Sequence, residues 1–193
     1  MTDLSKETLR HEAIRHRDRI QVLQNEDPEA VCGLFFDALR PGTDQVIAAY
    51  WPKDREFDPG AILERALREG LVCALPVMKK GEKILSFARW KDGDPLEPGP
   101  FNVQQPVADE RAQWVDPDIV IVPLLAFDRR GYRLGYGGGF YDATLRDLRR
   151  KKKIIAAGVG FAQQAVIFNL PVEDHDERLD WIFTPQKAHF FGA

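Results

Sequence analysis

The residue types most suited to chemistry gather in a glycine-dense segment between a basic and an acidic side chain. Arg133 precedes the run Gly135-Tyr136-Gly137-Gly138-Gly139, and Phe140, Tyr141 and Asp142 follow it. Glycines let the backbone approach a ligand closely, and a helix that begins after them directs its free N–H groups and positive dipole end toward that ligand. The segment therefore predicts an anion site. The alternative is a glycine turn that only connects a strand to a helix.

Asp142 makes the expected anion more specific. A carboxylate in the first turn of a helix complements the helix dipole, but beside bare phosphates it would repel them. A divalent cation between the acid and the phosphates removes this conflict. A polyphosphate bridged by Mg²⁺ to Asp142 therefore accounts for the glycines, Arg133 and the acid together. The segment matches neither the G-x-G-x-x-G motif nor a Gly-Lys-Ser/Thr motif.

The flanking letters predict the elements that position this segment. Residues 120–128 form an apolar run with β-branched side chains, which predicts a buried strand. Tyr141, Leu145 and Leu148 recur at helical spacing and predict a helix over residues 141–150. The chain is therefore expected to run from a strand through the glycine turn into a helix.

The rest of the chain alternates between helices and strands. Apolar periodicity and capping residues predict helices over residues 5–23, 28–39 and 59–67. Apolar runs predict strands over residues 46–51, 71–75, 84–90 and 154–160, and residues 91–106 predict a long loop over the sheet. Short connections in β-α-β order imply parallel pairing. We expect one α/β domain over residues 1–193, with three αβα layers and a mostly parallel, Rossmann-like sheet.

Composition limits the possible classes of function. The 193 residues are 44% hydrophobic and 30% charged with a net charge of −3, which suits one domain without a general attraction to nucleic acid or membrane. No segment approaches the ~18 apolar residues of a membrane span, and the first residues lack a signal-peptide core. Cys32 and Cys73 match no metal or redox spacing and predict buried thiols in a cytoplasmic protein.

The glycine segment, together with Pro123-Leu124-Leu125-Ala126-Phe127-Asp128, resembles the signature of the 5-formyltetrahydrofolate cyclo-ligases, also called methenyltetrahydrofolate synthetases. The resemblance continues in residues 101–106, 161–164 and 170–184 and so covers nearly the whole chain. It implies an enzyme that uses ATP and Mg²⁺ to convert 5-formyltetrahydrofolate into 5,10-methenyltetrahydrofolate, ADP and phosphate. It also implies a fold related to sugar-phosphate isomerases and CoA transferases.

The resemblance assigns roles to individual residues. It implies that Arg133, Tyr141 and Asp142 are catalytic, and that Asp142 and Asp176 hold Mg²⁺. The residues that it implies for ATP are Lys6, Arg10, Arg133, Gly135, Tyr136, Gly137, Gly138, Gly139, Phe140, Tyr141 and Asp142. Those that it implies for the folate are Trp51, Glu56, Phe101, Gln105 and Tyr141.

Several of these residues also have an ordinary structural interpretation. One face of the first helix predicts a solvated basic surface made of Lys6, Arg10, Arg15, Arg17 and Arg19. Glu56 fits a surface-loop acid, Phe101 fits an anchor between its loop and the core, and the acids of residues 173–180 fit a solvated turn.

The segment departs from many relatives in ways that leave other functions open. Those relatives carry Lys or Arg where this chain has Tyr136 and Gly138, and usually Tyr where it has Phe140. Phosphate contact is therefore expected from the backbone, Arg133 and the first helix. The alternatives are a folate or nucleotide binder without catalysis and a sugar-phosphate isomerase or CoA-transferase-like enzyme. We expect only small-molecule partners and a monomer or weak homodimer.

Overall fold

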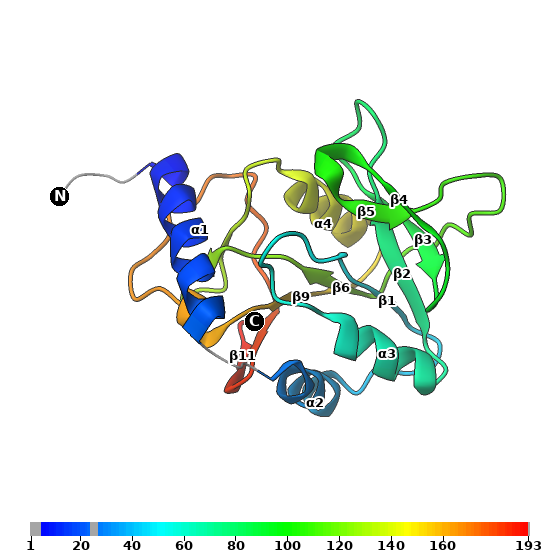
Figure 1. The fold of residues 1–193 in the computed structure, drawn as a ribbon, viewed down its shortest axis with the longest axis horizontal. Helices are drawn as coiled ribbons and strands as arrows, with labels where there is room; N and C mark the ends of the chain where they lie inside the picture. Colours follow the sequence, from blue (N-terminus) through cyan, green and yellow to red (C-terminus); the bar gives the residue numbers. More distant parts are fainter. Residues whose placement is uncertain (1–4, 24–26, 193) are drawn as a thin grey trace.

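A seven-stranded mixed sheet forms the centre of the molecule (Figure 1). The computed structural model describes residues 5–23 and 27–192. The sheet has the order β11-β10-β9-β6-β1-β2-β3. Its strands are β1 (Val46–Ala48), β2 (Val72–Val77), β3 (Ser86–Trp90), β6 (Ile119–Val122), β9 (Ile155–Val159), β10 (Trp181–Thr184) and β11 (Lys187–Phe190). The strands from β10 to β2 run parallel, whereas β11 and β3 at the two edges run antiparallel to their neighbours.

Helices cover both faces of this sheet. They are α1 (Lys6–Leu23), α2 (Pro28–Leu39), α3 (Gly60–Arg68) and α4 (Phe140–Lys151). Figure 1 shows α2 and α3 on one face, α4 on the other, and α1 at one end of the molecule. The predicted three-layer α/β architecture is therefore confirmed. None of the described helices is long and apolar enough to span a bilayer.

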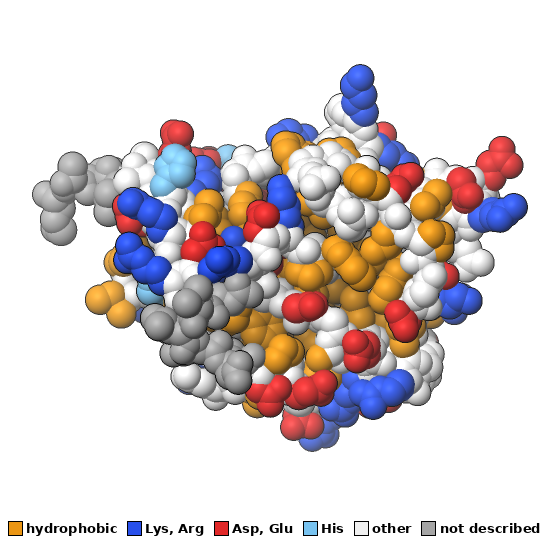
Figure 2. Space-filling model, viewed as in Figure 1, with side chains coloured by type: hydrophobic (Ala, Val, Ile, Leu, Met, Phe, Trp, Pro, Cys, Tyr) orange, Lys and Arg blue, Asp and Glu red, His pale blue; other side chains and the backbone are white. Residues whose placement is uncertain are grey.

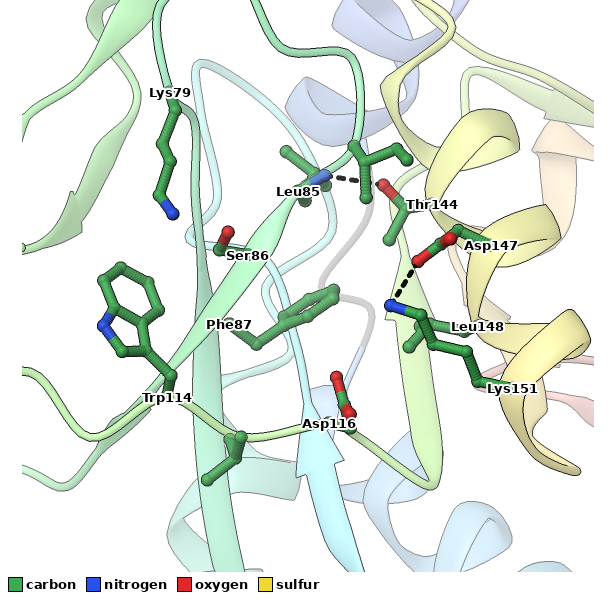
Figure 3. A pocket seen from close by; sticks show the side chains of 12 residues that line it. Lys79, Leu85, Ser86, Phe87, Trp114, Asp116, Thr144, Asp147, Leu148 and Lys151 are labelled. Atoms are coloured by element: carbon green, nitrogen blue, oxygen red, sulfur yellow. Dashed lines mark hydrogen bonds and ion pairs between the residues drawn. The ribbon is translucent and has the colours of Figure 1, made fainter.

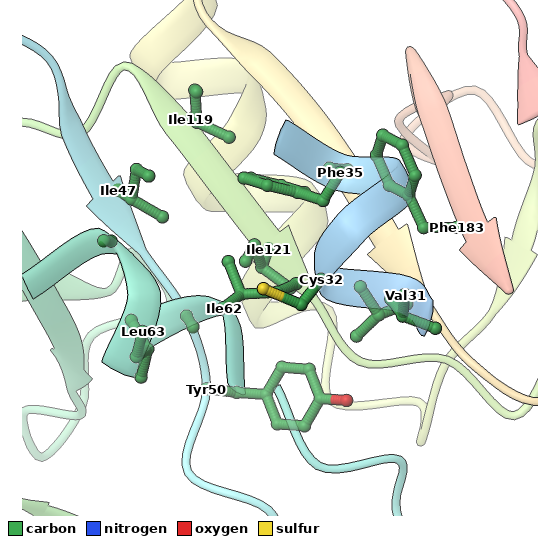
Figure 4. Packing of buried hydrophobic residues seen from close by; sticks show 14 of the residues in the cluster. Val31, Cys32, Phe35, Ile47, Tyr50, Ile62, Leu63, Ile119, Ile121 and Phe183 are labelled. Carbon is green, nitrogen blue, oxygen red and sulfur yellow. The ribbon is translucent and has the colours of Figure 1, made fainter. Parts of the chain in front are cut away.

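Alternating side chains of the central strand β6 build the two cores. Ile119 and Ile121 pack with α2 and α3, as Figure 4 shows beside Phe35 and Ile62, whereas the next positions face α4. All four side chains of β6 are buried. A strand buried on both faces needs a continuous apolar sequence, which is why residues 119–122 lack the alternation of a surface strand.

The direction of the chain reverses between β1 and β6. From β1 the chain crosses through α3 to β2 on one side, whereas from β6 it crosses through α4 to β9 on the other. The loops that leave the carboxyl ends of β1 and β6 therefore diverge and open a crevice between them. In open α/β sheets, ligands bind at such a switch point. Residues 49–59 and residues 123–139 flank this crevice.

Some predicted boundaries are wrong. The predicted strand over residues 120–128 ends at Val122, because the chain turns at Pro123 and then forms the hairpin of β7 (Ala126–Phe127) and β8 (Arg133–Leu134). The expected loop over residues 91–106 contains a second hairpin, β4 (Leu96–Pro98) with β5 (Gln104–Pro106). The predicted strand over residues 46–51 ends at Ala48. The edge hairpin of β10 and β11 has no counterpart among the predicted elements.

Asp128 fixes the turn that leads into β8. Its side chain is fully buried, and its carboxylate accepts hydrogen bonds from the backbone N–H groups of Arg130 (2.9 Å), Tyr132 (3.2 Å) and Leu170 (3.0 Å). The Arg130 guanidinium adds an ion pair at 2.7 Å and also donates to the Leu170 carbonyl. One buried carboxylate thus joins the β7–β8 turn to a segment 42 residues further along the chain.

We expect Asp128→Asn to destabilise the fold by about 1–3 kcal/mol, because it leaves Arg130 and the buried Leu170 N–H without their charged acceptor. Urea denaturation of the variant measures this loss. The control is Asp109→Asn, since Asp109 makes a similar local turn contact to Arg111 N at 2.8 Å but is exposed. Equal stability of the two variants would contradict the role given to Asp128.

Candidate active site

The glycine turn delivers the start of α4 to the switch point without a side-chain cap. Gly139 occupies the N-cap position with φ of 70°, and within residues 5–23 and 27–192 no side chain caps the first N–H groups of the helix. Gly137 has φ of 91°, a backbone conformation that L side chains rarely adopt. The uncapped N–H groups and the positive dipole end of α4 are therefore available to an anion.

Helix α1 lies against this turn. Arg10 Nε donates to the Gly135 carbonyl at 3.0 Å, and its guanidinium packs against Gly137, where a Cβ would lie 3.1 Å from Arg10 Cζ. A cavity of about 360 Å³ separates α1 from the turn and is lined by Glu7, Arg10, His11, Ile14, Leu125, Tyr136 and Gly137. The structure thus brings Arg10 and the glycines together around one cavity.

Arg133 and Asp142 form an ion pair beside the turn. Arg133 Nη2 lies 3.1 Å from Asp142 Oδ1, and the Arg133 side chain is only 5% exposed. The same oxygen accepts the backbone N–H of Glu177 at 3.0 Å, while Arg133 Nη1 donates to the Glu177 carbonyl at 3.0 Å. The pair therefore holds Glu177 against the start of α4, and Glu177 is the residue that directly follows Asp176.

Asp176 pairs with Lys6 at the other end of this contact. Lys6 Nζ lies 2.6 Å from Asp176 Oδ2 and 3.5 Å from Glu173 Oε2. Burial acts to raise the pKa of Asp176, but the hydrogen bonds from Lys6 and from the Glu173 N–H outweigh it and lower that pKa. The ligand atoms of Glu173, His175 and Asp176 lie within 4.8 Å of one another. Glu173 and Asp176 are thus bound to Lys6, so this segment is not the purely solvated turn that its composition suggested.

Glu56 reaches the same crevice from the loop after β1. Its Oε2 accepts the Lys53 N–H at 2.8 Å. Burial raises the pKa of the Glu56 carboxyl, whereas the Lys53 N–H, the Tyr136 hydroxyl and the charge of Arg17 lower it in part. Tyr141, at the start of α4, has its pKa raised by burial and by the negative charge of Glu56. Glu56 is therefore a partly buried acid beside the glycine turn.

Apolar side chains gather in a hollow of the surface. Figure 2 shows them in a hollow between α4 and the β4–β5 hairpin on one side and α3 on the other. The Phe101 ring, 67% exposed, packs edge-on against Phe140 with centroids 6.0 Å apart, and Lys53 Nζ donates to the Phe101 carbonyl at 2.6 Å. Trp51 packs edge-on against Trp90 with centroids 5.9 Å apart.

Gln105 is less accessible than these aromatic residues. It is 7% exposed, and its Oε1 accepts the Met78 N–H at 3.0 Å. This contact joins strand β5 to the end of β2. Within the described residues the Gln105 side-chain oxygen therefore serves the packing of the hairpin, and only its amide N–H groups remain for a ligand.

Comparison with known proteins identifies the family. Residues 3–185 match the family model described as the 5-formyltetrahydrofolate cyclo-ligase family. The chain belongs to this family. It is 31% identical over 182 residues to the 5-formyltetrahydrofolate cyclo-ligase of Haemophilus influenzae, which covers 91% of this chain and 95% of the relative. The Escherichia coli relative of the same name is 34% identical over 148 residues, which cover 74% of this chain and 79% of the relative.

A solved structure supports the same assignment. The 5,10-methenyltetrahydrofolate synthetase of Aquifex aeolicus superposes with a TM-score of 0.73 at 26% identity, covering 96% of this chain and 92% of that one. Family membership therefore agrees in sequence and in fold, and indicates an enzyme with 5-formyltetrahydrofolate cyclo-ligase activity. It favours this activity over the sugar-phosphate isomerase and CoA-transferase alternatives.

Two cations of the site were not predicted from the sequence. Lys83 Nζ donates to the Gly138 carbonyl at 2.7 Å and lies 5.3 Å from the Phe140 ring centroid, so the β2–β3 loop adds a cation to the glycine turn. Arg17, predicted to be solvated, is 2% exposed and donates to the Tyr136 hydroxyl. The basic turn at residues 79–83 gave only a weak indication that Lys83 belongs to the site. Nothing in the sequence distinguished Arg17 from the other basic residues of the helix.

A second groove lies on the far side of α4 (Figure 3). Its volume is about 390 Å³, and Figure 3 shows Lys79 and Trp114 opposite Asp147 and Lys151. Lys151 Nζ pairs with Asp147 at 2.7 Å, and the Thr144 hydroxyl bonds both the Phe140 carbonyl and the Leu85 N–H. Asp147, Lys151 and Thr144 are thus already bound within the protein, and the groove contains none of the predicted site residues.

We expect Gly137→Ala to weaken ATP binding about tenfold, because alanine costs about 1–2 kcal/mol at positive φ and its Cβ displaces the Arg10 guanidinium. Isothermal titration with ATP measures the effect. Gly33→Ala in α2 is the control, since an added Cβ there meets nothing within 4 Å. If both variants bind ATP as the parent does, the contact between Arg10 and the turn has no part in the nucleotide site.

Proposed function

We propose that this enzyme converts 5-formyltetrahydrofolate into 5,10-methenyltetrahydrofolate with consumption of Mg²⁺-ATP and release of ADP and phosphate. The proposal rests on one observation: an anion site and a carboxylate beside an apolar surface lie next to each other. An uncapped helix start with cations on two sides lies next to a partly buried carboxylate with an apolar hollow beyond it. The first suits a nucleotide and the second suits a pterin.

The nucleotide phosphates would bind at the glycine turn. The first N–H groups of α4 and the backbone of residues 135–139 supply donors, as in other anion sites at helix starts. Lys6, Arg10 and Lys83 supply positive charge from α1 and from the β2–β3 loop. A base within the glycine segment is therefore unnecessary, because cations from outside the segment reach the same turn.

Asp142 and Asp176 would hold Mg²⁺. Each has one carboxylate oxygen bound by protein donors, and no described residue donates to the other oxygen. Mg²⁺ binds through one or two carboxylates together with substrate phosphates, so one oxygen from each acid fits this ion. When bound, the ion would neutralise charge on the phosphates. Lys6 and Arg133 would orient the two acids.

Glu56 would anchor the pterin. A pterin presents adjacent N–H donors, and a carboxylate can accept two of them at once. The apolar hollow with Phe101, Phe140 and Trp51 would hold the flat ring system beside Tyr141. The folate and the nucleotide would then approach each other across the start of α4.

The reaction requires alignment more than a protein nucleophile. The formyl oxygen attacks the γ-phosphorus of ATP, an oxygen–phosphorus bond forms, and ADP leaves. N10 of the folate then adds to the formyl carbon, which closes the ring; phosphate departs and N10 loses its proton. Transfer of a phosphoryl group depends on positioning and charge neutralisation, which Arg133, the cations at the turn and the backbone N–H groups can provide. We propose a cytoplasmic monomer or weak dimer.

The direct test incubates the protein with 5-formyltetrahydrofolate, ATP and Mg²⁺ and follows phosphate release and methenyl absorbance together. Both signals should rise in a fixed ratio and require both substrates. Saturable ligand binding without phosphate release would identify a binder without catalysis and overturn the proposed reaction.

We expect Asp142→Asn to lower turnover by about two orders of magnitude, because it removes the charge that would hold the ion and orient Arg133. The same assay at limiting Mg²⁺ measures the loss. Asp147→Asn is the matched control, since Asp147 lies in the same helix and pairs with Lys151. Near-normal turnover of Asp142→Asn at limiting Mg²⁺ would exclude a metal role for this acid.

We expect Glu56→Gln to weaken folate binding roughly tenfold to hundredfold, because an amide N–H would face a pterin donor at a cost of ~1–3 kcal/mol. Affinity for Mg²⁺-ATP should stay unchanged. Separate titrations with the two ligands measure this, with Asp54→Asn in the exposed part of the same loop as control. An equal loss for both ligands, or none for the folate, would show that Glu56 is not the pterin anchor.

A further inference from the structure

Helix α1 carries one buried arginine. Arg17 is 2% exposed, whereas Arg15 and Arg19 on the same helix are exposed. Among the described residues no carboxylate lies within ion-pair distance of Arg17, and its Nε has no hydrogen-bond partner. A buried guanidinium without an ion pair costs several kcal/mol. Its retention therefore needs a compensating interaction.

Tyr136 provides the main contact of Arg17. Arg17 Nη1 donates a hydrogen bond to the Tyr136 hydroxyl, and Arg17 Cζ lies 5.8 Å from the centre of the Tyr136 ring. A hydroxyl that accepts from a guanidinium keeps its own proton free for a second partner. Tyr136 is thus set to donate toward an acceptor on its other side.

The acidic neighbour of this hydroxyl is Glu56, because each of the two side chains influences the pKa of the other. The Tyr136 hydroxyl and the charge of Arg17 both favour the ionised form of the Glu56 carboxyl. The Lys53 N–H already binds Oε2 of the same carboxylate at 2.8 Å. Arg17, Tyr136 and Glu56 thus form a chain that joins α1, the glycine turn and the loop after β1.

We propose that Arg17 and Tyr136 are positioning residues of the folate site: Arg17 holds the Tyr136 hydroxyl, and this hydroxyl orients the Glu56 carboxylate toward the pterin. The inference rests on the proposed role of Glu56. It assigns the Tyr136 hydroxyl to the folate site and not to the ATP site that the resemblance implied. The Tyr136 ring still lines the cavity beside α1.

The buried position of Glu56 explains the need for this chain. A carboxylate accepts two pterin donors only while it is ionised, and burial favours its neutral form. Arg17 offsets this effect from a distance, because its charge acts within a poorly solvated environment. The titratable or charged groups that face Glu56 are Lys53, Asp54, Arg17, Tyr136, Tyr50 and Tyr141.

The contacts among Arg17, Tyr136 and Glu56 should affect how folate affinity depends on pH. The pKa of Glu56 lies above its usual value, so affinity is lost as pH falls through that pKa. Removal of Arg17 or of the Tyr136 hydroxyl takes away an influence that lowers this pKa. The pKa then rises further, and the loss of affinity moves to higher pH.

The test uses the full chain with Arg17→Gln and Tyr136→Phe, and Arg19→Gln as the exposed control on the same helix. Binding of 5-formyltetrahydrofolate is titrated across mildly acidic to mildly alkaline pH. Carbon-13 NMR follows the Glu56 carboxyl in the ligand-free protein. Both variants should raise the pKa of Glu56 and shift the acidic loss of folate affinity upward by about one unit, roughly tenfold in affinity on the acidic side.

A double variant tests whether the two residues act in series. Arg17→Gln with Tyr136→Phe should weaken folate binding by less than the sum of the two single losses, because Arg17 acts partly through the hydroxyl and partly by its own charge. An Arg17→Lys variant should restore part of the shift, since it returns a positive charge. Fully additive losses would overturn the series arrangement.

Each outcome separates this inference from the proposed function. Parent protein that neither binds nor converts 5-formyltetrahydrofolate would overturn the proposed function. Parent protein that binds the folate, with variants that keep the parent pKa of Glu56, would overturn the inference alone. A loss of affinity by the same factor at every pH would show that Arg17 only stabilises the fold, and Tyr136→Phe gives the decision if Arg17→Gln does not fold.

Discussion

The ion pair between Arg133 and Asp142 holds the site together. It lies at the junction of strand β8, the first turn of α4 and residues 173–177, and Glu177 binds both partners through its backbone. Asp128 and Arg130 hold the other end of the same C-terminal segment at Leu170. The hairpin of β7 and β8 therefore fixes both ends of residues 170–177. Together with Lys6 of α1, these contacts fix the position of Asp176 relative to the glycine turn.

Sequence patterns predicted the layers because the core depends on local periodicity. The apolar run at residues 119–122 had to be buried on both faces, and Asp27 with Pro28 marked the start of α2, where the Asp27 side chain accepts the Glu29 N–H. The glycine segment likewise predicted a turn before a helix. Hairpins were harder to predict, because β10 and β11 are short and directly follow a segment whose clustered acids suggested a solvated turn.

Without the family resemblance, which implied the part of Arg10, the candidate site was predictable only where neighbours in sequence are neighbours in space. Arg133, the glycines and Asp142 lie in one segment, so their meeting was predictable. Lys83 reaches Gly138 from 55 residues away, and Arg17 reaches Tyr136 from 119 residues away. The spacing of apolar residues along the sequence does not predict contacts between such distant residues. The burial of Arg17 depends on the packing of α1 against the β7–β8 hairpin through Leu9 and Leu134, a contact that the tertiary fold creates.

Helix α1 carries Arg10 and Arg17 on one rigid body, seven residues and so nearly two turns apart. One contacts the turn proposed for the nucleotide, and the other contacts the tyrosine beside Glu56. A mutation that slides or tilts this helix therefore alters both half-sites together. Substitution of Arg10 or Arg17 alone changes one contact, whereas a movement of the whole helix changes both, so the packing of α1 couples the two proposed ligands.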